Sequence, residues 1–119
     1  MPRVLVCEGE RHITRLIQVN LERQGYEVLA RSDGNSCLQL LRQTPVDLLV
    51  IGEPEAMTSN EVLSAIQDDP SIEVKVLVLR KRPDFPEPPT GPFGGSPPMV
   101  ISSPVLIPDL RSLLTEAAI

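Results

Sequence analysis

The sequence predicts an α/β fold in which five parallel strands form a doubly wound sheet with helices on both faces. Three nearly unbroken apolar runs support this fold class, at residues 4–7, 46–51 and 74–79. A continuous run of branched apolar residues is typical of a strand covered on both faces, as in the middle of a parallel sheet. Segments with helical spacing of apolar residues lie between these runs, and this alternation of strand and helix favours parallel pairing.

The first strand and the helix that follows it are predicted at residues 4–7 and 11–24. Gly9 is expected to permit a tight turn between them. Apolar residues recur at helical spacing from Ile13 to Leu21, which predicts an amphipathic helix. Gly25 is expected to end this helix in a left-handed conformation.

The second and third strands are predicted at residues 26–30 and 46–51. Between them, Asp33-Gly34 predicts a turn into a short helix that ends before Pro45. The third strand runs directly into Gly52 and Glu53-Pro54. In parallel sheets, ligands bind beyond the carboxyl ends of the strands, so these residues lie where a functional site is expected.

The remaining elements are a third helix, a fourth strand, a fifth strand and a last helix. Thr58 or Ser59 can cap the third helix, which is expected to end at Asp69-Pro70. The strands are predicted at residues 74–79 and 99–102, and the last helix at residues 108–117, with Pro108 in its first turn.

The interval at residues 80–98 breaks the alternation, because residues 83–98 include seven prolines and three glycines. Proline removes backbone donors and clashes with the preceding helical turn, so an extended crossover, partly polyproline II, is expected instead of a fourth helix. We expect Phe85 and Phe93 to pack on the sheet surface that the missing helix leaves bare, although a flexible loop is the alternative. Apolar surface left over is a candidate docking surface. Its residues are Phe85, Pro88, Pro89, Phe93 and Met99.

Composition limits the classes of function. The chain has 119 residues (13.1 kDa) with a net charge of −5, which predicts one domain over residues 1–119 and argues against nucleic acid or membrane partners. No membrane span or signal peptide is recognisable, so a cytoplasmic location is expected. Cys7 and Cys37 are predicted to be buried, reduced thiols, because two cysteines and one histidine define neither a zinc site nor a disulfide framework.

The order of elements resembles the receiver domain of bacterial two-component response regulators, which has a flavodoxin-like fold. The resemblance covers nearly the whole chain. It is carried by Val4-Leu5-Val6-Cys7-Glu8-Gly9-Glu10, Leu21-Glu22-Arg23-Gln24-Gly25-Tyr26-Glu27-Val28, Asp33-Gly34, Val46-Asp47-Leu48-Leu49-Val50-Ile51 and Ser103-Pro104. The family implies a phosphoacceptor aspartate after the third strand and an acidic pair after the first, which together hold magnesium. It also implies a hydroxyl residue after the fourth strand and a lysine after the fifth.

This chain departs from that pattern at almost every position. The resemblance places a degenerate phosphoacceptor pocket at Glu8, Gly9, Gly52, Arg80, Ser103 and Pro104. The acceptor position is a glycine, and only Glu8 and Pro104 are retained in kind. One carboxylate is a poor magnesium site, so no magnesium, other cofactor or catalytic residue is expected.

The predicted function is therefore a non-enzymatic, receiver-like signalling module that acts through phosphorylation-independent contacts with other signalling proteins or with itself, as a homodimer. One alternative is a receiver phosphorylated at a non-standard acidic residue such as Glu53. A second is a small nucleotide-binding protein or enzyme, although no glycine-rich phosphate loop follows the first strand. The side chain of Glu53 is expected to point away from the pocket, because side-chain direction alternates along a strand. A further hypothesis places Arg80 against Glu8 or Glu53 as a permanent positive charge.

Overall fold

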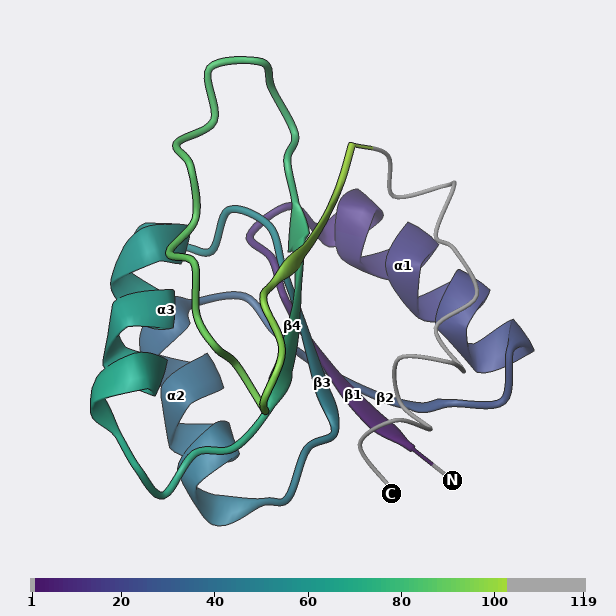
Figure 1. Cartoon of the computed structure of the whole chain (residues 1–119). Helices are drawn as coiled ribbons and strands as arrows, with labels where there is room; N and C mark the ends of the chain where they lie inside the picture. Colours follow the sequence, from purple (N-terminus) through teal and green to yellow (C-terminus); the bar gives the residue numbers. More distant parts are fainter. Residues whose placement is uncertain (1, 103–119) are drawn as a thin grey trace.

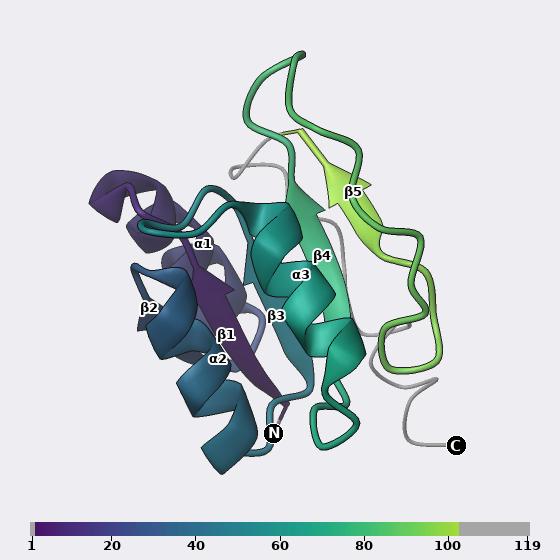
Figure 2. The same ribbon diagram turned by 90° about the vertical axis from the view of Figure 1, so that its left-hand side faces the viewer.

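The computed structural model describes residues 2–102, which form a five-stranded parallel sheet and three helices. The strands are β1 (Arg3–Cys7), β2 (Glu27–Arg31), β3 (Leu48–Ile51), β4 (Lys75–Leu79) and β5 (Met99–Ile101). The helices are α1 (Arg11–Arg23), α2 (Gly34–Gln43) and α3 (Ser59–Asp68). The strand order is β2-β1-β3-β4-β5, as Figure 2 shows. The predicted fold class is confirmed, with element ends shifted by one or two residues. The last helix predicted at residues 108–117 lies outside the described residues.

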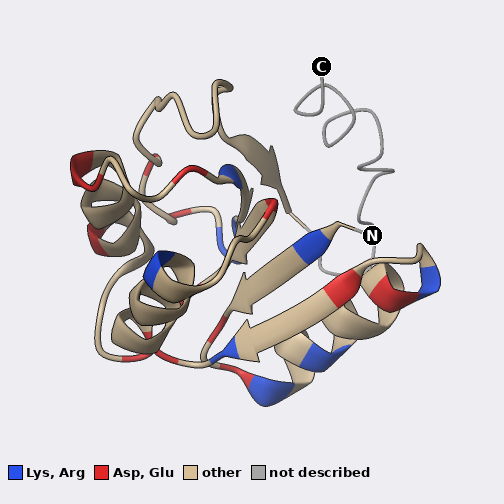
Figure 3. Ribbon diagram, turned by 90° about the horizontal axis from the view of Figure 1, so that it is seen from below, with Lys and Arg blue, Asp and Glu red and all other residues tan. Residues whose placement is uncertain are grey.

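The domain has three layers, with α2 and α3 on one face of the sheet and α1 on the other (Figure 1). Strands β1, β3 and β4 lie in the middle, where all but Arg3 are buried. Their side chains alternate between two apolar clusters, so that Leu49 faces α2 and α3 while Val50 faces α1. Charged residues within the strands occur only at strand ends, as in β2, which begins with Glu27 and ends with Arg31 (Figure 3).

Local capping explains where the helices begin and end. The Asp33 carboxylate accepts the N–H of Ser36 at the start of α2. Thr58 and Glu61 form a capping box at the start of α3, in which each side chain accepts the other residue's backbone N–H. Gly25 follows α1 with a φ of 93°, which confirms the predicted left-handed end.

The crossover at residues 80–98 contains no helix, as predicted, and runs beside α3 before it enters β5 (Figures 1 and 2). Phe85 and Phe93 are 3% and 2% exposed and belong to the cluster formed with α2 and α3. Two side chains from helices and strands outside the crossover, Asn60 of α3 and Lys75 of β4, form hydrogen bonds with it. Lys75 Nζ donates to Gly94 O (3.2 Å) and Ser96 Oγ (2.5 Å), and Asn60 Nδ2 donates to a crossover carbonyl at 2.9 Å. The expectation that the two phenylalanines pack on the sheet is confirmed.

Candidate functional site: a filled pocket at the carboxyl edge of the sheet

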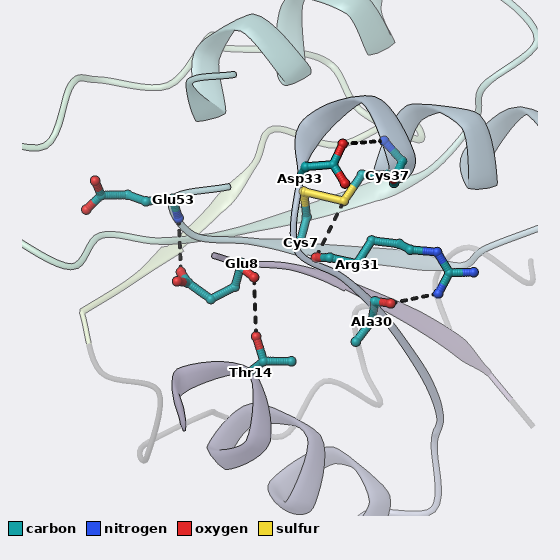
Figure 4. The surroundings of a disulfide bond; sticks show 9 residues. Cys7, Glu8, Thr14, Ala30, Arg31, Asp33, Cys37 and Glu53 are labelled. Atoms are coloured by element: carbon teal, nitrogen blue, oxygen red, sulfur yellow. Dashed lines mark hydrogen bonds between the residues drawn. A yellow bond between two sulfur atoms is a disulfide. The ribbon is translucent and has the colours of Figure 1, made fainter. Parts of the chain in front are cut away.

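The loops that follow β1, β3 and β4 meet at the carboxyl edge of the sheet, around the carboxylate of Glu8. Glu8 is 2% exposed. Its Oε1 accepts the backbone N–H of Glu53 (3.0 Å), and its Oε2 accepts the N–H of Glu10 (2.7 Å). The Lys81 ammonium lies 3.0 Å from Oε2. Figure 4 shows the Glu8 side chain reaching to the backbone of Glu53. A buried carboxylate needs such partners, because an unpaired buried charge is very costly.

Gly52 leaves room for this carboxylate. A Cβ atom at position 52 would lie 2.0 Å from Glu8 Oε1, far inside any possible contact distance. The Glu8 carboxylate thus occupies the space into which a side chain at the acceptor position would project. Any larger residue at position 52 requires Glu8 to leave its place between the two backbone donors.

Gly9 lies at the bend between β1 and α1, where the sequence predicted a tight turn, and there is little space around it. Its φ is not positive, so this turn does not use the left-handed conformation that glycine allows. A Cβ at Gly9 would lie 3.0 Å from the carbonyl oxygen of Glu53, which accepts the Gly9 N–H at 3.0 Å. The loops after β1 and β3 therefore approach so closely that a Cβ at this position would require a small shift of the Glu53 carbonyl.

Lys81 supplies the positive charge of the pocket. Its ammonium donates to Glu8 Oε2 and to Glu10 Oε1, the latter at 2.5 Å, and the side chain is 14% exposed. Burial lowers the pKa of Lys81, but the hydrogen bonds with Glu10 and Glu8 outweigh burial and hold the pKa above its usual value. The same hydrogen bond and charge lower the pKa of the Glu10 carboxyl. The pocket therefore holds a lysine ammonium between the carboxyl groups of Glu8 and Glu10.

The hypothesis that Arg80 contacts Glu8 or Glu53 is wrong. Arg80 Nη2 donates to the carbonyls of Pro83 (3.4 Å) and Phe85 (3.3 Å), so its guanidinium stabilises the crossover. The two following residues supply the contacts proposed for Arg80. The Arg-Lys-Arg triplet signalled positive charge at this edge, but sequence alone could not tell which member faces the pocket.

Glu53 points away from the pocket, as predicted (Figure 4). Its two carboxylate oxygens accept from Arg82 Nε (3.0 Å) and Nη2 (2.8 Å). This hydrogen-bonded pair lowers the pKa of Glu53 and raises that of Arg82. This ion pair lies at the surface and links the loop after β3 directly to the crossover, in addition to the Lys81–Glu8 contact.

Only some residues of the predicted docking surface are exposed in the structure. Phe85 and Phe93 are buried, so they cannot serve as exposed contact residues. Pro88, Pro89 and Met99 are partly exposed, and their role in binding stays a prediction. Ser103 and Pro104 lie outside the described residues.

The donor set of this pocket does not suit magnesium. Magnesium is usually held by carboxylates together with water and phosphate, whereas both oxygens of Glu8 accept backbone N–H groups and its Oε2 also binds the Lys81 ammonium. Gly9 and Gly52 have no side chains to offer. Within residues 2–102, no group of three or more His, Cys, Asp and Glu side chains is arranged to hold a metal ion.

Cys7 and Cys37 are joined in a disulfide, so the prediction of two reduced thiols is wrong. The bond links the last residue of β1 to the first turn of α2, with a Cα–Cα distance of 6.2 Å (Figure 4). Both residues are fully buried. The sequence predicted a buried strand and helix at these positions but could not show that the two side chains face each other across the α2 side of the sheet.

Comparison with solved structures identifies the fold. The chain superimposes on the response regulator TrrA of Thermotoga maritima, solved in complex with Mg²⁺-BeF, with a TM-score of 0.76 at 20% identity, covering 98% of this chain and 99% of that one. The structure of the histidine kinase ThkA in complex with TrrA matches with a TM-score of 0.70 at 19% identity and 98% coverage of both chains. The chain has the receiver fold.

Sequence comparison relates this receiver-type domain to response regulators. It is 41% identical over 49 residues to the alkaline phosphatase synthesis transcriptional regulatory protein PhoP of Bacillus subtilis, covering 41% of this chain. It is 31% identical over 86 residues to the transcriptional regulatory protein KdpE of Mycobacterium tuberculosis, covering 71% of this chain. The matches span only 20% and 37% of those relatives' own lengths. No family model matches the sequence. The helices within residues 2–102 are too short or too polar to cross a bilayer.

Proposed function

We propose that this receiver-type domain is a signalling module of a two-component or related pathway that acts through protein contacts without being phosphorylated. One observation carries the proposal: the Glu8 carboxylate fills the space of a side chain at position 52 and is already paired with Lys81. A receiver switches when phosphate contacts favour one of two existing arrangements. Here an internal carboxylate and ammonium fill the pocket, so phosphate cannot switch the surface that the domain presents.

The partners are proposed to be other signalling proteins, or a second copy of the chain. Structures of this fold include a receiver bound to a histidine kinase, which makes a signalling protein a reasonable class of partner. A cytoplasmic location and the absence of catalysis are part of the same proposal. Glu8 is buried and both oxygens of Glu53 bind Arg82, so neither carboxylate is free to act as a substitute acceptor.

Incubation of the intact chain with acetyl phosphate and Mg²⁺, followed by intact-mass measurement, tests the proposal. We expect no gain in mass, while a receiver with an acceptor aspartate, treated in parallel, gains one phosphoryl group. A phosphoryl gain that is lost in Glu53→Gln or Glu8→Gln would instead establish phosphorylation at a non-standard acidic residue. Light scattering of the untreated chain then distinguishes a homodimer from a monomer that requires another partner.

A further inference from the structure

The disulfide lies directly beside the filled pocket. Cys7 precedes Glu8 in the chain, and Cys37 lies in the first turn of α2, where its N–H donates to Asp33 O at 3.1 Å. First turns of helices open more readily than their interiors. The bond can therefore be reached by a small thiol after a local opening of α2, although both sulfurs are buried in the closed structure.

The carbonyl of Arg31 connects the sulfur atoms to Glu8. This oxygen accepts the backbone N–H of Glu8 at 3.2 Å, and Cys37 Sγ lies 3.9 Å from the same oxygen (Figure 4). A disulfide sulfur carries no hydrogen, whereas a thiol is a weak donor. Reduction would therefore create an S–H group that can donate to the same carbonyl that accepts the Glu8 N–H.

Reduction also changes the space that the two residues need. Unbonded sulfur atoms stay at van der Waals separation, and the surroundings are closely packed, so the end of β1 and the first turn of α2 must adjust. Glu8 is the next residue, and its carboxylate fits closely between Gly52, two backbone N–H groups and Lys81. A small displacement at Cys7 is thus transmitted to the pocket and, through Lys81, to the start of the crossover.

We propose that Cys7 and Cys37 form a reversible dithiol–disulfide pair whose oxidation state controls how firmly Glu8 is held in the pocket. The co-reactant is a low-molecular-weight thiol. One thiolate attacks a sulfur of the disulfide and forms a mixed disulfide, releasing the other cysteine as a thiol. A second thiolate then releases the remaining cysteine, so two electrons and two protons reach the protein while two thiol molecules become one disulfide. Disulfides in reducing compartments are usually transient and redox-sensing, which agrees with the location proposed above.

The first test is whether the folded chain interconverts. The full chain is equilibrated in mixtures of reduced and oxidised glutathione, free thiols are trapped by alkylation, and the mass is measured. We expect a single transition between a form with no alkylated cysteine and a form with two, reversible from both directions. Two outcomes would overturn the proposal. A chain that keeps its disulfide in fully reduced glutathione would have a purely structural crosslink. A chain that keeps both thiols in fully oxidised glutathione would have two cysteines that do not pair.

The second test measures the effect on the pocket. The amides of Glu10 and Glu53 bind the Glu8 carboxylate directly, so their hydrogen exchange reports its position. We expect exchange about two- to tenfold faster at these amides in the dithiol form. The amide of Thr44, which binds Leu40 O at the far end of α2, is expected to change less.

Equal exchange at Glu10 and Glu53 in the two forms would overturn the coupling, as would a uniform acceleration that includes Thr44. The double variant Cys7→Ala/Cys37→Ala is expected to lose any response to reductant. Both redox forms are wild type, so the test holds even if that variant folds poorly. The proposed lack of phosphorylation does not depend on these outcomes, because mass measurement with acetyl phosphate tests it separately.

Discussion

Helix α3 and the crossover at residues 80–98 cover the same face of the sheet by different means. Helix α3 pairs its own backbone groups and buries Val62, Leu63 and Ile66. The crossover has few backbone donors because seven of its residues are prolines, and it buries Phe85 and Phe93. Several of its backbone carbonyls accept hydrogen bonds from side chains, including Lys75 of β4 and Asn60 of α3.

This difference shows what an irregular segment requires to replace a helix. A helix needs an apolar stripe and caps, so its stability is spread over many similar contacts. The crossover depends on two buried phenylalanines and a small number of side-chain hydrogen bonds. Single substitutions should therefore have larger and more localised effects in the crossover than in α3.

Phe93→Ala is expected to have the largest effect. Loss of a buried phenylalanine leaves a cavity and should lower the free energy of unfolding by about 3–5 kcal/mol. Val100→Ala is the matched control, because Val100 is 44% exposed, and it should change stability by less than about 0.5 kcal/mol. Urea unfolding measures both. Equal small effects would show that the crossover is a loosely attached loop.

Lys81→Met is expected to have the second-largest effect. It removes a charged hydrogen bond from the buried carboxylate of Glu8 and should lower the free energy of unfolding by about 1.5–3 kcal/mol. Arg82→Met is its neighbour and control. The Arg82 and Glu53 side chains are 49% and 33% exposed, so water screens the pair and this change should cost less than about 1 kcal/mol. A larger loss in the free energy of unfolding for Arg82→Met than for Lys81→Met would contradict this prediction. It would mean that the Arg82–Glu53 pair stabilises the crossover more than the Lys81–Glu8 contact does.

Most of the fold could be predicted from the sequence because its signals are local. The runs at residues 46–51 and 74–79 are apolar without alternation, which indicates central strands wherever they occur. The prolines of the crossover exclude a helix without reference to any other segment. Strand ends were less certain, since Val46 and Val74 are buried just before their strands begin and extend the apolar runs.

The contacts within the pocket could not be predicted in the same way. The sequence identified Glu8, Gly52 and the positive triplet, but the choice among Arg80, Lys81 and Arg82 depends on how the chain turns as it leaves β4. The pairing of Cys7 with Cys37 depends on the position of α2 over β1. Both are properties of tertiary packing between residues 30 or more positions apart.

Gly52→Ala is expected to have an intermediate effect that depends on Glu8. The new methyl group would overlap Glu8 Oε1, so the substitution should cost about 1–3 kcal/mol of stability. In a Glu8→Ala background the carboxylate is gone and the same methyl group should cost much less. A double-mutant cycle by urea unfolding measures this coupling. Additive effects would mean that Glu8 does not occupy the space beside position 52.

Asp69 follows α3 and links it to α2 through Arg42. Substitution of Asp69 is expected to have the smallest effect on stability. Hydrogen bonds from Ser71 and Arg42 lower the pKa of its carboxyl from 3.8 to about 2. A lowered pKa means that the contribution to stability is present above 3.8 and is lost as the pH falls towards 2. Asp69→Asn should therefore flatten the pH dependence of the urea midpoint in that window and leave its shape above pH 5 unchanged. An unchanged slope between pH 2 and 4 would show that the hydrogen bonds of this partly buried carboxylate contribute nothing to stability.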